Sequence, residues 1–270
     1  MEGLRKFEGA GLIRRDGKTE FNVEKAAEWA AERAEEWYTQ IDPKIGTYLV
    51  DANVVLTVAG ARGQTELFID NAEEKDLETI KKLNALSEPQ GVRFNVREFS
   101  EKLHNGGKFI GVEVESLKGY EFTSRRSKIP GITPFDSSKG WDAVPQWRIS
   151  LEENMKRLQQ EGVIPRHLKV DSLNVGFEKG YPDRAIYDFA EEKSHKEKHG
   201  KELTDAAIPL VGLYGGAIPI YNFYAEHRND PEIMRHQLEW ETTLNKFYQS
   251  NWHQKLKEDP IFKQWRSQHK

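Results

Sequence analysis

Hydrophobic residues recur along the first half of the chain with two different periods. Between Asn22 and Gln40 they return every three or four positions, about 3.6 residues per turn, which predicts an amphipathic helix with one apolar stripe. From Thr47 to Val58 the chain is rich in β-branched residues and alternate positions are apolar, which predicts a strand. A turn at residues 60–63 and a short strand over Thr65–Asp70 would complete a hairpin.

The same order of elements returns further along the chain. Asn71 and Glu74 have the spacing of a capping box, so a second helix is expected to begin there. Two more strands are predicted over Val92–Phe99 and Lys108–Glu115. The order helix, strand, strand, repeated once, fits a four-stranded antiparallel sheet with both helices on one face. We therefore expect an α+β domain over residues 1–118.

The last part of the chain is patterned as helices. Ser150 and Glu153 have capping-box spacing and precede an apolar stripe. Asp230 followed by Pro231 is typical of a helix that begins with a cap and a first-turn proline. We expect an all-helical domain over residues 150–270.

Residues 119–149 separate these two halves. The segment contains Pro130, Pro134 and Pro145, which predicts a connector without a regular element. A solvated linker would not need its large aromatic residues, so we expect the connector to pack across both halves. These residues are Phe122, Phe135, Trp141 and Trp147.

From Ala206 to Ala225 the chain has no charged residue. About 20 residues is the length of a transmembrane helix, but Pro209 and Pro219 would each remove a backbone donor from it. We expect instead two short helices joined at Gly215-Gly216, forming the central packing element of the helical half. The side chains expected to be buried are Ile208, Leu210, Leu213, Ile218, Ile220 and Phe223.

Composition narrows the class of protein. The chain has 270 residues, 11% of them aromatic, so it can build a core and is not intrinsically disordered. It has no cysteine, which excludes disulfides, thiolate catalysis and zinc fingers. Its net charge of −4 gives no support to a general nucleic-acid-binding role. The first 15 residues have no apolar run, so no secretory signal is expected and a cytoplasmic location is the default.

One stretch resembles a known pattern. The segment Gly176-Phe177-Glu178-Lys179-Gly180-Tyr181-Pro182 resembles the Gly-x-x-Leu-Gly-Tyr-Pro part of a motif that continues x-Cys-Cys in an uncharacterised prokaryotic family. The segment His227 to Glu232 is similar to a second, Cys-containing motif of that family. This chain has Lys179 in place of the leucine, and Arg184 and Ala185 where the cysteines would fall. The resemblance therefore implies no thiol or metal role here, and no activity.

The outer face of the predicted sheet is the best candidate site. If the apolar alternate positions face the helices, polar residues on the other positions gather on one surface, with Phe68 and Phe109 among them. Its carboxylates suit acid–base catalysis or binding of a hard divalent cation, and the candidate catalytic residues are Asp51, Glu113 and Glu115. Candidate ligand-binding residues on the same face are Asn53, Arg93 and Arg97. The alternative is an ordinary half-covered face whose charges form ion pairs.

A second candidate is the short basic segment Ser124–Lys128. Arg125 and Arg126, with neighbouring hydroxyls, have the chemistry to hold phosphate, and the alternative is a structural or solvated loop. His195 and His199 lie four residues apart on a predicted helix, but the surrounding charges favour a solvated helix end, and no metal site is predicted.

Two functions remain open from the sequence. The first is an enzyme or a binder of a small anionic ligand, with a site between the sheet face and the helical half. The second is a non-catalytic interaction module or homo-oligomer, which would present a flat exposed patch with tryptophan at its centre. No motif identifies a cofactor or a reaction, and no strong nucleic-acid signal is present.

Overall fold

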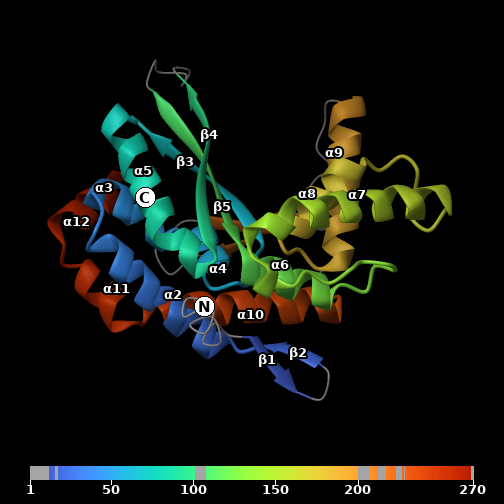
Figure 1. Ribbon diagram of the computed structural model, residues 1–270, viewed down its shortest axis with the longest axis horizontal. Helices are drawn as coiled ribbons and strands as arrows, with labels where there is room; N and C mark the ends of the chain where they lie inside the picture. The colour runs from blue at the N-terminus through green and yellow to red at the C-terminus, as the bar shows by residue number, and fades with distance from the viewer. Residues whose placement is uncertain are drawn as a thin grey trace.

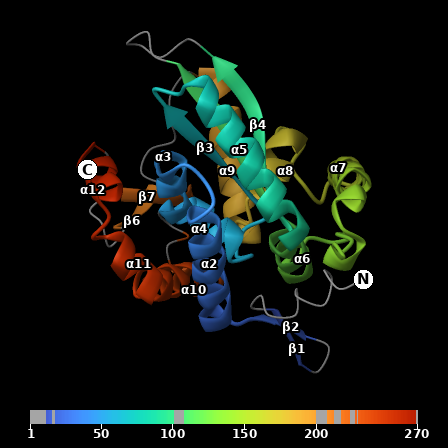
Figure 2. The same cartoon turned by 60° about the vertical axis from the view of Figure 1, so that its left-hand side comes forward.

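A three-stranded sheet lies at the centre of the molecule, with helices from both ends of the chain on one side and helices from its middle on the other (Figures 1 and 2). The structure is a computed structural model. It describes residues 12–15, 18–100, 108–199, 207–211, 217–222, 227 and 229–268.

The sheet is antiparallel throughout. Its central strand β5 (Phe109–Ser116) lies between β3 (Gln64–Asp70) and β4 (Val92–Ser100). Helices α2 (Val23–Tyr38) and α5 (Glu74–Ser87) both pack on the inner face, because α2 brings Trp37 against Phe94 of β4 and α5 brings buried leucine and isoleucine side chains. The expected α+β class, with two helices on one face of an antiparallel sheet, is confirmed.

The prediction of a strand over Thr47–Val58, and hence of a fourth strand, is wrong. This segment consists of α3 (Pro43–Gly46), the 3-10 turn η2 (Thr47–Val50) and α4 (Ala52–Val58). Asp51 caps α4, accepting hydrogen bonds from the backbone N–H groups of Asn53 at 2.9 Å and Val54 at 3.2 Å. Almost every side chain of α4 is buried, so the run is apolar on all sides and its apparent alternation does not distinguish a helix from a strand.

The segment that joins the two halves contains regular structure, contrary to the expectation of a bare connector. Helix α6 (Leu117–Arg126) begins directly after β5, with Ser116 as its cap. Two 3-10 turns, η4 (Ser137–Lys139) and η5 (Trp141–Ala143), lead into α7 (Val144–Gln160). Its aromatic residues are not solvated, since three are buried and one is partly buried: Phe122, Phe135, Trp147 and Trp141.

The helical half also differs from prediction at particular points. Helix α7 begins at Val144 with a proline in its first turn, so the capping box expected at Ser150 is wrong. Asp230 caps α10 as predicted, accepting from the N–H groups of Glu232 at 2.8 Å and Ile233 at 3.2 Å. The remaining helices are α8 (Val170–Glu178), α9 (Asp183–His199), α10 (Pro231–Tyr248), α11 (Asn251–Leu256) and α12 (Pro260–Gln268).

Two hairpins lie outside the predicted elements. The uncharged segment 206–225 was expected to form two short helices, but it contains β6 (Ala207–Val211) and β7 (Ala217–Asn222), paired antiparallel with Pro209 opposite Pro219. The expected burial of its side chains lies outside the described residues. No helix of the described chain is long and apolar enough to cross a membrane. The second hairpin joins β1 (Leu12–Arg15) to β2 (Lys18–Phe21).

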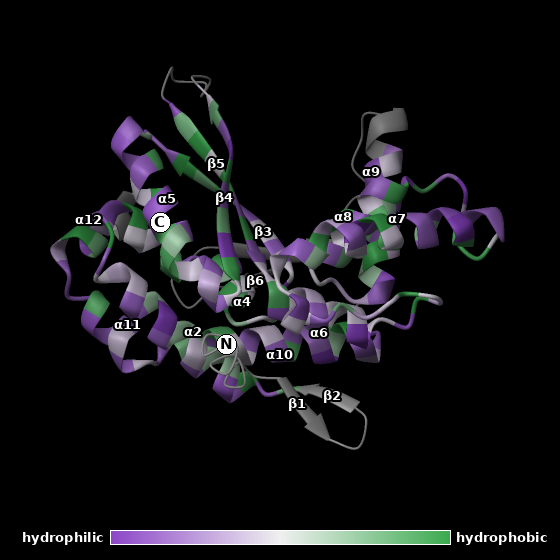
Figure 3. Ribbon diagram, viewed as in Figure 1, coloured by the Kyte–Doolittle hydropathy of each residue, from purple (hydrophilic) through white to green (hydrophobic). Residues whose placement is uncertain are grey.

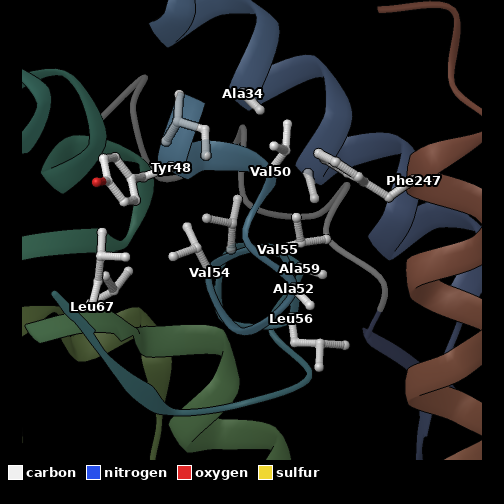
Figure 4. Packing of buried hydrophobic residues seen from close by; sticks show 14 of the residues in the cluster. Ala34, Tyr48, Val50, Ala52, Val54, Val55, Leu56, Ala59, Leu67 and Phe247 are labelled. Atoms are coloured by element: carbon white, nitrogen blue, oxygen red, sulfur yellow. The ribbon is translucent and has the colours of Figure 1, made fainter. Parts of the chain in front are cut away.

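Buried residues form two hydrophobic clusters that do not follow the order of the chain. One joins α2, α4 and the inner face of the sheet to α10, α11 and α12, and Figure 4 shows Phe247 of α10 beside Val50, Val55 and Ala34. Tyr248 of α10 also donates a hydrogen bond to the carbonyl of Val50 at 3.0 Å. The other cluster fills the space among α6, α7, α8 and α9. The predicted division of the chain into a domain over residues 1–118, a connector over 119–149 and a domain over 150–270 stays a prediction.

The two clusters meet where three backbone segments approach closely. Arg62, only 3% exposed, donates from Nε to the carbonyl of Lys179 at 3.2 Å, and its guanidinium carbon lies 5.1 Å from the ring centre of Trp240. Gly119 and Gly63 permit this packing. A Cβ on Gly119 would lie 1.7 Å from the Arg62 carbonyl oxygen, and one on Gly63 would lie 2.4 Å from that of Glu178.

The first prediction concerns this close approach. We expect Gly119→Ala to lower the free energy of unfolding by about 1–3 kcal/mol, because the added methyl group meets backbone that has no room to move. Gly111→Ala, whose Cβ would meet its neighbours at an ordinary 3.7 Å, is the control and should change stability by less than about 0.5 kcal/mol. Urea unfolding of both variants measures the difference, and equal stabilities would contradict the prediction.

Candidate functional site

The outer face of the sheet carries the polar residues that its alternation predicts. Pairing across the strands places Glu66 of β3 and Asn95 of β4 on either side of Glu113, and Arg93 of β4 beside Glu115. Figure 3 shows hydrophilic and hydrophobic positions alternating along β4 and β5. The predicted gathering of these residues on one surface is therefore observed for the three true strands.

Two predicted site residues do not lie on this face. Asp51 and Asn53 belong to the start of α4, because the segment expected to be a strand is helical. The Asn53 side-chain oxygen accepts a hydrogen bond from the Arg62 guanidinium. Burial raises the pKa of Asp51, while hydrogen bonds from the backbone oppose that rise. Both residues thus contribute to the close packing around Arg62.

Glu115 lies at the point where the sheet meets the helical half. The residue is 4% exposed, and its carboxylate accepts hydrogen bonds from Asn95 at 2.6 Å, Tyr120 at 2.8 Å and Arg148 at 3.0 Å. These three donors stabilise negative charge on a carboxylate that would otherwise be costly to bury. Burial, and then the charge of Glu115, raise the pKa of Tyr120 well above its usual value, so its hydroxyl remains a donor.

Arg148 of α7 connects the sheet to α8. Besides Glu115, its guanidinium donates to Glu178 at 2.6 Å, to the Tyr120 oxygen at 2.7 Å and to Gln64 of β3 at 3.2 Å. Burial raises the pKa of Glu178, and the charge of Arg148 opposes this rise. A single guanidinium on α7 therefore contacts two strands, β3 and β5, and two other helices, α6 and α8.

Glu113 has a different environment, although it is only two residues from Glu115 on β5. It is 9% exposed and lies at the edge of the covered part of the face. Its partner is Arg97 of β4, whose side chain is 61% exposed. Burial, and then the charge of Glu115, raise the pKa of Glu113, while Arg97 opposes the rise.

The other predicted arginines have partners within the protein. Arg93 pairs with Glu88 and lies over the ring of Trp141, 4.3 Å from its centre. The segment expected to be a basic loop is the last turn of α6 and the residues after it, where Arg125 pairs with Glu121 at 3.0 Å and Arg126 with Glu239 at 2.6 Å. A phosphate would therefore have to displace carboxylates.

Three residues that complete the cluster from the helical half were not predicted from the sequence: Arg148, Tyr120 and Glu178. The first two lie in the segment interpreted as an irregular connector. Glu178 belongs to the stretch that resembles the Gly-Tyr-Pro motif, which was the one available signal. The two stretches of that resemblance also meet in space, since the ring of His227 receives hydrogen bonds from Arg184 and contacts Asp188 at 2.7 Å.

Metal ligands do not gather in the part of the chain that the structure describes, where no group of three histidine, aspartate or glutamate side chains is arranged to hold an ion. The predicted helix with His195 and His199 is α9, in which Glu191 lies 3.8 Å from His167, and the side chain of His199 lies outside the described residues.

Comparisons with protein-family models, with curated proteins and with solved structures find no match to this chain. What this site does must therefore be argued from its own geometry.

The second prediction concerns Arg148. Arg148→Met should lower the free energy of unfolding by about 3–5 kcal/mol, because it leaves Glu115 and Glu178 buried without their shared cation. Arg157→Met removes a surface pair with Glu161 on the same helix and should cost less than about 1 kcal/mol. Chemical denaturation at pH 7 distinguishes the two, and a cost no larger than that of the control would show that the cluster does not join the halves.

The third prediction concerns pH. Since the folded-state pKa of Glu113 is raised above the ordinary 4.5, the folded protein binds more protons than the unfolded chain just above that pH. The contribution of Glu113 to stability should therefore fall as pH rises from about 4.5 to its folded-state pKa. Glu113→Gln should remove this part of the pH dependence. Unfolding free energies measured across the acid range test it, and identical slopes for variant and parent would refute it.

Proposed function

We propose that the protein is an enzyme that acts on a small polar molecule at the outer face of the sheet, with Glu113 as its general acid–base group. The observation that carries this proposal is the contrast between Glu113 and Glu115. Two carboxylates, two residues apart on one face of β5, have different environments: Glu115 is held by three hydrogen-bond donors, whereas burial and the charge of Glu115 raise the pKa of Glu113. Such a contrast is typical of sites that divide acid and base roles between paired carboxylates.

Glu115 is the fixed member of this pair. With three donors on its carboxylate and 4% exposure, it cannot reach a substrate, and its role is to hold negative charge beside Glu113. This charge favours the protonated form of Glu113. Glu115 and Arg148 are thus positioning residues.

Glu113 is the member that exchanges protons. Its partner Arg97 is mostly exposed, so a bound substrate is able to draw the guanidinium away from the carboxylate. Losing that cation would raise the pKa of Glu113 further, because Arg97, ahead of Arg148, opposes the effects of burial and Glu115. Substrate binding would then prepare Glu113 to donate a proton.

The anionic ligand expected from Arg93 and Arg97 has less support than acid–base chemistry. Both guanidinium groups are engaged by carboxylates, Glu88 and Glu113. An anion would need to compete with these partners.

The interaction module remains a second candidate. One observation favours it: Met234 and Leu238, four residues apart on α10, are 53% and 64% exposed. The tryptophan-centred patch expected for such a module is not seen among the described side chains, where every tryptophan is buried or partly buried: Trp29, Trp37, Trp141, Trp147, Trp240 and Trp252.

The fourth prediction tests the proposed activity. Purified protein is incubated with a mixture of small metabolites, and mass spectrometry follows which compounds are consumed and formed. We expect a substrate and product pair whose conversion falls by about 100-fold or more in Glu113→Gln, since general acid–base groups contribute that much.

Glu35→Gln, an exposed carboxylate on α2, is the matched control and should convert the same compound at the parental rate. Near-parental conversion by Glu113→Gln, with folding verified by its unfolding curve, would overturn the assignment. A mixture in which no compound changes would count against enzymatic function.

A further inference from the structure

A small cavity lies where α6, α10 and the turn between α8 and α9 meet. Its volume is about 10 Å³, which is the smallest space that holds one water molecule. Residues of all three elements line it, among them Thr123, Arg126, Gly180, Asp183, Glu232 and His236. The cavity therefore lies at the junction of the hydrophobic cluster that contains α6 and α8 with the one that contains α10.

The hydroxyl group of Thr123 lacks the bond that helical threonines usually form. Thr57, Thr79 and Thr243 each donate to the backbone carbonyl four residues earlier, at 2.8, 3.0 and 2.8 Å. Thr123 is only 7% exposed, yet its Oγ1 has no hydrogen-bond partner among the residues that the structure describes. A Cβ built on Gly180 would lie 3.2 Å from this oxygen, so the hydroxyl points at the turn that borders the cavity.

A second polar group at the cavity is in the same state. The side chain of Arg126 is 14% exposed, and its Nη1 donates to Glu239 at 2.6 Å. Its Nη2 is buried and has no acceptor in the described part of the chain. Thr123 and Arg126 are three residues apart on α6, so their side chains lie on the same side of the helix. An occupant that bonds to both atoms would satisfy two buried groups at once.

The lining determines what kind of occupant fits. An anion would meet the carboxylates of Asp183 and Glu232, and the charge of Arg126 is already paired with that of Glu239. A cation would meet the guanidinium itself. An apolar atom or molecule would leave both polar groups unsatisfied, and a larger polar molecule exceeds the volume. A neutral molecule of the smallest size, able both to accept and to donate, remains.

We propose that this cavity binds a single long-lived water molecule, which accepts a hydrogen bond from Nη2 of Arg126 and shares a second with the hydroxyl of Thr123. The ring of His236 and the backbone at Gly180 border the same space and offer further polar atoms. Internal water molecules are held by two to four such partners. The water is thus a structural ligand at the junction of the two clusters, and the inference does not depend on the proposed function.

The first measurement counts long-lived internal water molecules of the whole protein by oxygen-17 magnetic relaxation dispersion. We expect Thr123→Val, which keeps the shape of the side chain but removes the hydroxyl, to hold one fewer than the parent. Thr123→Ser restores the hydroxyl and should retain the parental number. Thr243→Val is the matched control, because this buried hydroxyl bonds to its own helix, and it should also retain the parental number.

The sign of the stability change is an independent test. With water bound, Thr123→Val removes one of its partners, and we expect the unfolding equilibrium constant to rise by about 2- to 10-fold, the effect of one hydrogen bond. In an empty cavity the same substitution would replace an unsatisfied hydroxyl with a methyl group, and the variant would be as stable as the parent or more so.

A high-resolution crystal structure completes the experiment. We expect an electron-density peak about 3 Å from both Oγ1 of Thr123 and Nη2 of Arg126. An unchanged number of internal water molecules in Thr123→Val, a variant at least as stable as the parent, or a cavity without density would each overturn the proposal. A peak that bromide replaces, with its anomalous signal, would identify a halide ion and would overturn it as well.

Discussion

The close approach of three backbone segments around Arg62 is the constraint on which the rest of the structure depends. Gly63 lies against the carbonyl of Glu178, and Gly119 lies against the carbonyl of Arg62, so the start of β3, the start of α6 and the end of α8 have fixed positions relative to one another. Three members of the Glu115 cluster lie at these contacts, because Gln64 follows Gly63, Tyr120 follows Gly119 and Glu178 supplies one of the carbonyls. The geometry of the candidate site is therefore set by contacts that leave no room for a methyl group.

Patterns that report one buried face were sufficient to predict much of this fold. Strands β3 and β4 and helix α2 each have one buried and one exposed side. The period of hydrophobic residues can therefore be recognised in their sequences. The segment Thr47–Val58 has no exposed side in the folded protein, so its period carries no information, and the strand predicted there is a helix. Asp51 and Asn53 were misplaced for that reason alone.

For the same reason, only the part of the candidate site that lies on the strands could be predicted from the sequence. Its strand residues, Glu113, Glu115 and Arg97, follow from alternation. Arg148, Tyr120 and Glu178 come from three helices whose contact with the sheet depends on tertiary packing, which local patterns do not encode. Their effect is nonetheless decisive. They make Glu115 a buried carboxylate with satisfied hydrogen bonds, while its neighbour Glu113 has an exposed guanidinium, that of Arg97, as its partner.

The hydrophobic cluster beneath the sheet has a consequence for biosynthesis. Side chains of α10, α11 and α12 complete a core that otherwise belongs to α2, α4 and the strands. The strands are therefore synthesised long before the helices that cover them. Until translation passes Phe262, the apolar surface of the nascent chain stays exposed to other molecules. Chains released early by a premature stop codon would expose the same surface permanently, which makes them natural clients for chaperones and proteases.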